Sequence, residues 1–162
     1  MNKFRRRDTL ELAGALVGCQ LAGLVGSVFT APAIPTWYSS LNKPSFTPPS
    51  WVFAPVWVTL FTLMGLSLFV VLRKGFEKPA IRRAVSVFVA QLVLNMLWSV
   101  AFFGLRSPLY GLFVIILLWI ALLATIAVFY GISRTAAVLL VPYFLWGSFA
   151  SVLNFSILAL NP

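Results

Sequence analysis

Long apolar stretches alternate with short polar segments along this chain, and each stretch is hydrophobic on every side of the helix that it would form. A helix needs roughly 20 apolar residues to cross a hydrocarbon core about 30 Å thick. A β-barrel would instead need short segments of alternating polarity. The pattern therefore predicts an all-α membrane protein, a single domain of residues 1–162 built as a bundle of five transmembrane helices. The five predicted helices are Thr9 to Phe29, Trp51 to Leu72, Pro79 to Phe103, Pro108 to Tyr130 and Arg134 to Leu160.

Composition and charge agree with this picture and add an orientation. With 61% hydrophobic and 9% charged residues, the chain cannot bury its apolar surface in one water-soluble core. The net charge of +9 lies at helix ends, so we expect a lipid bilayer and no nucleic acid as partner. Lys43 and Arg106 lie on one side of the predicted bundle. The N-terminal side, cytoplasmic by the positive-inside rule, carries Lys3, Arg5, Arg6, Arg7, Arg73, Lys74, Lys78, Arg82, Arg83 and Arg134. The C-terminus is then outside.

Two features of the N-terminal region leave alternatives open. The sequence "KFRRR" followed by an apolar run and "APA" resembles a secretory signal peptide, but the run is long for one, and we expect the segment to be retained as a helix. Small residues recur four apart in this helix, at Gly14, Gly18, Ala22 and Gly26. Such a stripe lets helices approach closely in lipid. It indicates either packing within the bundle or the seam of a homodimer.

The first connection differs from the others because it is long, polar and rich in proline. The connections between the third and fourth and between the fourth and fifth predicted helices are short, whereas residues 30–50 could fold over the end of the bundle. A loop of such length is usually functional. Pro44, Pro48 and Pro49 would stiffen it and lower the entropy lost on ordering. We predict that loop 30–50 is the lid of a pocket.

Missing residue types exclude several kinds of chemistry. The chain has no histidine, and the interiors of the last four predicted helices have no carboxylate. Proton relays and ion-coupled transporters normally carry ionisable residues within the membrane. Metal or haem sites held by imidazole and Ser/His/Asp catalysis are excluded as well. We therefore expect no metal and no cofactor.

Amides and aromatic side chains are what remain, and they gather on two helix faces. These groups either hydrogen-bond between helices or line a pocket. Pro142 predicts a kink beside the second face. A pocket of this kind suits a flat, hydrophobic, partly anionic molecule, with Lys43 or Arg106 near its outer mouth. The first face carries Gln91, Asn95, Trp98 and Ser99, and the second carries Tyr143, Trp146, Gly147, Ala150 and Asn154.

Three blocks of the sequence resemble one known family. The segment "WYSSLNKPSFTPPSWVFAPVW" at residues 37–57 is similar to the signature of the TspO/MBR family, which comprises the tryptophan-rich sensory proteins and the translocator proteins, or peripheral benzodiazepine receptors. The blocks "QLVLNMLWSVAFFG" and "PYFLWGSFASVLN" resemble two further blocks of that family. The resemblance implies five transmembrane helices, often a homodimer, and a ligand pocket closed by the first loop. It also implies a membrane receptor or sensor with a role in tetrapyrrole transport or regulation.

The resemblance also implies ligands and the residues that bind them. The implied ligands are porphyrins such as protoporphyrin IX, isoquinoline carboxamide and benzodiazepine drugs, and cholesterol in animal members. A porphyrin would be a ligand rather than a cofactor. An alternative activity is light-dependent degradation of porphyrin, with Trp51 and Trp146 as the catalytic candidates. The residues expected at the pocket are Trp37, Tyr38, Pro49, Trp51, Phe53, Asn95, Trp98, Tyr143, Trp146 and Ala150.

The end of the last helix departs from the animal pattern. The family's sterol motif needs a tyrosine followed by a basic residue, yet this chain reads "LNFSILALNP", with Phe155 in place of the tyrosine. Sterol binding through that motif, a weak pattern in any case, is therefore not expected. We expect a multi-pass protein of a microbial cell membrane.

Overall fold

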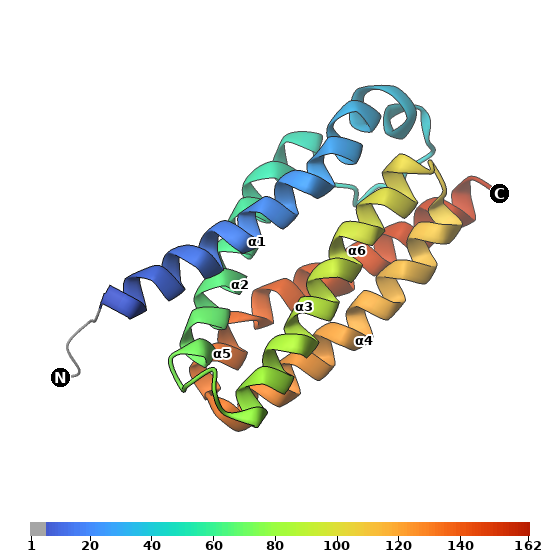
Figure 1. Cartoon of the computed structure of the whole chain (residues 1–162). Coiled ribbons are helices and arrows are strands. Elements are labelled where there is room, and N and C mark those ends of the chain that lie inside the picture. Colours follow the sequence, from blue (N-terminus) through green and yellow to red (C-terminus); the bar gives the residue numbers. More distant parts are fainter. Residues whose placement is uncertain (1–5) are drawn as a thin grey trace.

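Six α-helices build the computed structural model of the protein, which describes residues 6–162 (Figure 1). They lie roughly side by side along one long axis. Their bounds are α1 Arg6–Ala33, α2 Phe53–Leu72, α3 Pro79–Ser99, α4 Pro108–Ile132, α5 Arg134–Leu139 and α6 Val141–Leu160.

Five helical segments in the described part of the chain are long and apolar enough to cross a membrane. Each contains a window of mean hydropathy between 1.8 and 3.0. The segments are Arg6–Tyr38, Ser50–Leu72, Pro79–Gly104, Pro108–Ile132 and Arg134–Leu160. The predicted five-helix membrane bundle is thereby confirmed, and the protein is a multi-pass membrane protein. Which terminus faces the cytoplasm stays a prediction.

Two helices continue through a wide π-helical turn at the same end of the bundle. After α1, the turn covers Ile34–Tyr38, and after α3 it covers Val100–Gly104. Pro32 and Pro35 lack backbone N–H groups, yet both rings are exposed and the helix runs on to residue 40. The first helix is therefore longer than predicted. The connection that follows it comprises residues 41–49 rather than 30–50, and we call it the outer loop.

The last membrane segment is interrupted where proline predicts a kink. α5 ends at Leu139 and α6 begins at Val141, so the break lies two residues before Pro142. At the break, the Leu140 N–H donates to the Ala137 carbonyl at 3.1 Å, a tighter turn than that of an α-helix. The Pro142 ring removes a backbone donor, which is the physical cause of the interruption.

Close packing of α1 on α2 depends on Gly65. A Cβ at Gly65 would lie 2.9 Å from the Leu16 Cα, so any side chain there would push the two backbones apart. The predicted small-residue stripe behaves differently along its length. Ala22 and Gly26 are buried, whereas a Cβ at Gly14 or Gly18 would meet no atom within 4 Å. Packing within the bundle therefore explains only the C-terminal half of the stripe, Ala22 and Gly26.

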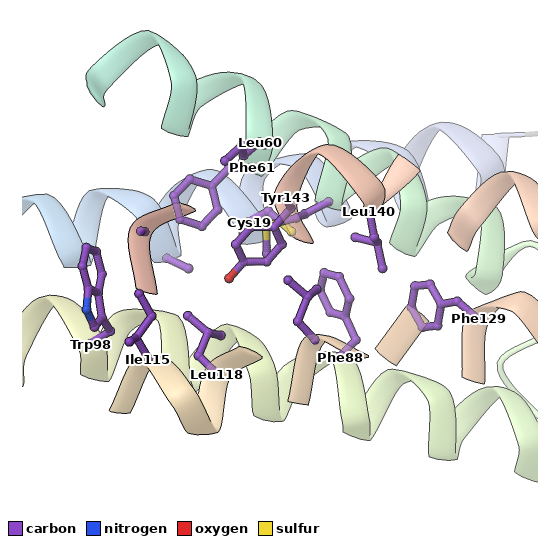
Figure 2. Close-up of a cluster of buried hydrophobic side chains, with 14 of the residues drawn as sticks. Cys19, Leu60, Phe61, Phe88, Trp98, Ile115, Leu118, Phe129, Leu140 and Tyr143 are labelled. Atoms are coloured by element: carbon purple, nitrogen blue, oxygen red, sulfur yellow. The ribbon is translucent and has the colours of Figure 1, made fainter. Parts of the chain in front are cut away.

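A closely packed cluster of buried side chains runs along the bundle interior, and the close-up shows it from Trp98 to Phe129 (Figure 2). Phe88 of α3 stacks on Phe129 of α4 with ring centroids 5.8 Å apart, and both side chains are fully buried. Tyr143 of α6 is also fully buried and lies next to Cys19 of α1 in the close-up (Figure 2). Residues of all five long helices contribute to this core, and the cavities lie toward the end of the bundle that carries the two π-helical turns.

Candidate functional site

A cavity of about 270 Å³ lies between α1, α2 and the end of α3. We call it the lateral chamber. α1 supplies a wall of small residues that includes Gly23, Gly26 and Thr30. α2 and α3 supply the opposite walls, which are aromatic and amide. The residues of these walls that matter below are Phe53, Trp57, Phe61, Asn95, Trp98 and Ser99.

A second cavity, of about 30 Å³, lies deeper, against α6. We call it the inner chamber. Trp146 and Ala150 line it together with Asn154. Five side chains line both chambers and so form the wall between them, which we call the aromatic partition: Tyr38, Phe53, Trp57, Trp98 and Phe103.

Ring contacts hold the aromatic partition together around Trp57. The Trp57 ring lies 6.2 Å from Trp98 and 6.2 Å from Tyr143, between centroids, and 5.6 Å from Phe61. Trp98 meets Phe103 edge to face at 5.9 Å. Pairs of this geometry contribute about 0.5–1.5 kcal/mol each beyond the area that they bury. Four members of the partition, Tyr38, Phe103, Trp98 and Trp57, are thus connected ring to ring, whereas the Phe53 ring contacts Trp146 of α6 at 5.9 Å.

Two hydrogen bonds join the two polar faces that the sequence shows, and a third ties the second face to the start of α4. Asn95 Nδ2 donates to the Tyr143 hydroxyl at 2.8 Å. Trp98 Nε1 donates to Asn154 Oδ1 at 3.3 Å, and Asn154 Nδ2 donates to the Pro108 carbonyl at 2.8 Å. The sequence left open whether these polar groups hydrogen-bond between helices or line a pocket. Asn95 and Trp98 do both, because each donates to a side chain of α6 and each lines the lateral chamber.

The structure brings six of the expected site residues to the two chambers. Tyr38, Phe53 and Trp98 belong to the aromatic partition, and Asn95 lines the lateral chamber. Trp146 and Ala150 line the inner chamber alone. Among the residues that the structure describes, no charged side chain lines either chamber, so the site is neutral and mainly apolar.

The other four expected residues lie elsewhere. Tyr143 is fully buried behind Asn95, and Trp37 packs on Phe102 at 5.4 Å, in contact with the aromatic surroundings but not with a chamber. Trp51 is 74% exposed and lines neither chamber, and neither does Pro49. The place of Trp51 at the first turn of the α2 segment turns its indole away from the bundle interior.

The outer loop packs on the end of α6, whereas other residues of the predicted lid segment 30–50 line the lateral chamber, namely Thr30, Ala31, Ile34, Tyr38 and Ser50. That this segment acts as a lid stays a prediction. None of residues 41–49 lines either cavity. Asn42 and Asn161 exchange two hydrogen bonds, of 3.0 and 2.9 Å, and the Phe46 ring contacts Phe149 at 6.3 Å. Lys43 Nζ donates to the Tyr38 and Leu41 carbonyls at 2.9 and 2.8 Å. Its ammonium group therefore stabilises the backbone where the first helix meets the loop.

Sequence reasoning missed two residues that shape the lateral chamber. Trp57 lies between Phe53 and Phe61 at a spacing of four, and this aromatic ridge along one face of α2 was a visible signal. Gln20 is a lone amide in the apolar α1, and its Nε2 donates to the Val58 carbonyl at 3.1 Å and to Thr62 Oγ1 at 3.0 Å. An uncharged amide in lipid needs such partners, which was the signal for it.

Gln91 is the one predicted polar residue of α3 that joins neither a chamber nor a hydrogen bond. Its side chain is fully buried, and both amide atoms are without a partner in the described part of the chain. It lies one helical turn below Asn95, toward the closely packed core. Nothing in its position assigns it to ligand binding.

Comparison with known proteins agrees with this architecture. The family model of the TspO/MBR family matches residues 15–160. The tryptophan-rich protein TspO of Chlorobaculum tepidum is 47% identical over 156 residues, which cover 96% of this chain and 99% of that protein. The human translocator protein is 36% identical over 146 residues, which cover 89% and 86% of the two chains. The chain therefore belongs to the TspO/MBR family.

Proposed function

We propose that this protein is a membrane receptor that binds planar apolar molecules, with protoporphyrin IX as the prototype, in the lateral chamber, and that it serves tetrapyrrole transport or regulation. The observation that carries the proposal is the chamber itself, with indoles on one wall and small residues on the other. Flat ligands can stack on such indoles, and clefts lined by aromatic groups with a few polar groups are typical ligand sites. Membership of a family of sensory and translocator proteins supports a receptor role.

The neutral lining constrains how a porphyrin would lie. Burial of a carboxylate without a partner is costly, so the propionate groups would point toward the membrane surface while the ring enters the chamber. Asn95 and Ser99 offer hydrogen-bonding groups to ring nitrogens or to the amide of an isoquinoline carboxamide. At about 270 Å³ the chamber is near the lower end of ligand clefts, roughly 300–1,000 Å³. A tetrapyrrole would therefore fill it and extend out of its open side.

A space-filling substitution tests this site directly. Ala54 lines the lateral chamber and is exposed, so Ala54→Phe would fill the cavity without disturbing the core. We expect saturable quenching of tryptophan fluorescence by protoporphyrin IX, measured in the dark in detergent, and a dissociation constant at least about tenfold higher in this variant, a loss of about 1.4 kcal/mol.

The matched control is Ala124→Phe, which adds the same side chain to an exposed position of α4 that lines neither chamber. Its affinity should equal that of the parent. Equal weakening in both variants, or linear and unsaturable quenching in the parent, would contradict binding in the lateral chamber and would indicate partition into the micelle.

Light-dependent oxidation of a bound porphyrin by dioxygen is a second candidate function. One observation favours it: Trp57 lines both chambers and has Trp98 and Tyr143 within 6.2 Å, so an electron-rich indole would lie beside the excited ring. Of the two indoles that the sequence suggested for this role, Trp146 lines the inner chamber and Trp51 faces outward. Trp57 is therefore the indole better placed to contact the excited ring while dioxygen oxidises it.

Under illumination, Trp57→Phe should retain porphyrin binding, because an apolar ring remains, but should form the oxidised product several times more slowly. Trp51→Phe is the matched control and should behave like the parent, since Trp51 is 74% exposed outside both chambers. The absorption spectrum after illumination measures both. Identical bleaching in all three proteins would exclude a role for the chamber indole.

A further inference from the structure

We propose that ligands reach the lateral chamber sideways, from the hydrocarbon core of the bilayer, through a slot between α1 and α2, and not from beneath the outer loop. The inference rests on the proposed function, because it concerns the path of the same planar apolar ligand. It assigns to this receptor a ligand that is already dissolved in the membrane.

The rim of the chamber shows where it opens. Leu24 and Val58 line the chamber and are 61% and 57% exposed. Ser27 and Ala31 on α1 and Ala54 on α2 are also exposed lining residues. The floor, by contrast, is buried and consists of Asn95, Trp98 and Ser99. A cavity whose exposed residues come from two neighbouring helices and whose floor lies on a third opens between the first two.

The depth of the rim places the opening at the lipid. Val58 lies eight residues after Ser50, the first residue of the second membrane segment, and at 1.5 Å per residue this is roughly 12 Å along the helix. The slot therefore extends well below the end of the segment, into a region that hydrocarbon surrounds. Its exposed rim is mostly apolar, so a planar apolar molecule can pass it without crossing water.

Contacts between α1 and α2 limit the slot from below. Gln20 Nε2 holds the Val58 carbonyl and Thr62 Oγ1 at 3.1 and 3.0 Å. The Phe61 ring lies against Gly23, where a Cβ would be 2.6 Å from it. Further down, Gly65 lets the two backbones approach closely. The helices are thus fixed together in their lower halves and separated only where the chamber lies between them.

Access from above is closed by the way the outer loop is held. The loop is joined to the C-terminal residues by the two Asn42 and Asn161 hydrogen bonds and to α6 by the contact of Phe46 with Phe149. Lys43 ties its own turn to the end of the first helix through the Tyr38 carbonyl. Opening a path beneath the loop would break these contacts, whereas the slot needs no contact to break.

A cross-link across the slot tests the route. Ser27→Cys with Ala54→Cys, joined by a bis-maleimide, would bridge the rim, while the native Cys19 is 1% exposed and protected from the reagent. The comparison protein carries Asn42→Cys with Asn161→Cys, joined by the same reagent, which fixes the loop to the C-terminus. Stopped-flow quenching of tryptophan fluorescence would follow transfer of protoporphyrin IX from lipid vesicles to each protein in nanodiscs.

We expect the bridge across the slot to slow both association and dissociation by about tenfold or more relative to the same double-cysteine protein capped with a monofunctional maleimide, which accounts for any effect of bulk at these two chamber-lining positions on the dissociation constant. The bridged loop should leave both rates as in the parent. Slower association in the loop-bridged protein, with no change in the slot-bridged one, would overturn the proposal. Absence of saturable quenching in the unmodified parent would instead contradict the proposed function, so the two failures are distinguishable.

A second pair of substitutions acts without any cross-link. Leu24→Ala with Val58→Ala shortens two exposed rim side chains and leaves the Val58 carbonyl, which Gln20 binds, in place. A wider slot should raise the association rate several fold. Rates equal to those of the parent would mean that the ligand takes another path.

Discussion

At the scale of single residues, two buried amides in the same bundle have opposite surroundings. Asn154 is satisfied, because it accepts from the Trp98 indole and donates to the Pro108 carbonyl. Gln91 is fully buried, and neither of its amide atoms has a partner in the part of the chain that the structure describes. A buried polar group costs about 1–3 kcal/mol when it is left unpaired. Asn154 therefore stabilises the folded bundle, whereas the unpaired amide of Gln91 destabilises it.

One substitution applied at both positions tests this difference. Gln91→Leu removes an unpaired amide and keeps much of its volume, so the free energy of unfolding should rise by about 1–3 kcal/mol. Asn154→Leu leaves the Trp98 N–H and the Pro108 carbonyl without partners and should lower it by a similar amount. Thermal unfolding in one detergent measures both. A fall in midpoint temperature for Gln91→Leu would show that its amide is hydrogen-bonded in the membrane.

At the scale of elements, the contact of α1 with α2 decides both stability and access. Gly65→Ala would place a Cβ 2.9 Å from the Leu16 Cα, and neither backbone can yield easily. We expect a loss of about 1–3 kcal/mol from overpacking. Gly131→Ala, near the end of α4, is the matched control because a Cβ there meets nothing within 4 Å. It should stabilise by up to about 1 kcal/mol through helix propensity.

Thermal unfolding of the two alanine variants in the same detergent separates these effects. A midpoint for Gly65→Ala equal to or above that of the parent would mean that α1 can move outward without cost. In that case the contact between Gly65 and Leu16 could not limit how far the slot extends between α1 and α2.

The sequence predicts the elements of this bundle well, for identifiable reasons. A hydrophobic run longer than 20 residues has few alternatives to a membrane helix. A proline inside a helix predicts a break, found here at Leu140. The end of α1 was harder to predict from the sequence, because Pro32 and Pro35 are typical of the start of a loop although the helix continues to residue 40.

The site was only partly predictable, because helical periodicity shows which residues share a face but not what the face meets. Asn95 and Trp98 were found since polar groups in lipid turn inward. Trp57 lies on a face that is aromatic throughout and so carries no contrast in polarity. Trp51 belongs to the family's signature segment, yet a single turn at the start of the α2 segment decides that its indole points outward.

At the scale of the whole molecule, the bundle divides into a half that is closely packed and a half that contains the cavities. One half is closely packed around Phe88, Phe129 and Tyr143 and holds the helices together. The other half contains both chambers, the aromatic partition and the two π-helical turns. Wide turns of this kind occur frequently at functional sites in proteins. The packed half holds the helices together, so the other half can contain cavities without the bundle coming apart.

The aromatic partition adds a consequence at this scale. The inner chamber, of about 30 Å³, cannot hold a planar polycyclic ligand unless Trp57 and its neighbours move. A ligand in the lateral chamber would therefore touch Trp57 and Trp98 first, and Trp146 and Ala150 only after the partition has rearranged.

The most direct test of the proposed binding site is to locate a bound porphyrin in crystals of the protein. Zinc protoporphyrin IX is suitable because its metal gives an anomalous signal, and the chain has no histidine to bind the zinc elsewhere. We predict one zinc peak in the lateral chamber, between the small residues of α1 and the rings of Trp57 and Trp98. A peak in the inner chamber beside Trp146, or on the outer surface of the bundle with the lateral chamber empty, would contradict the account.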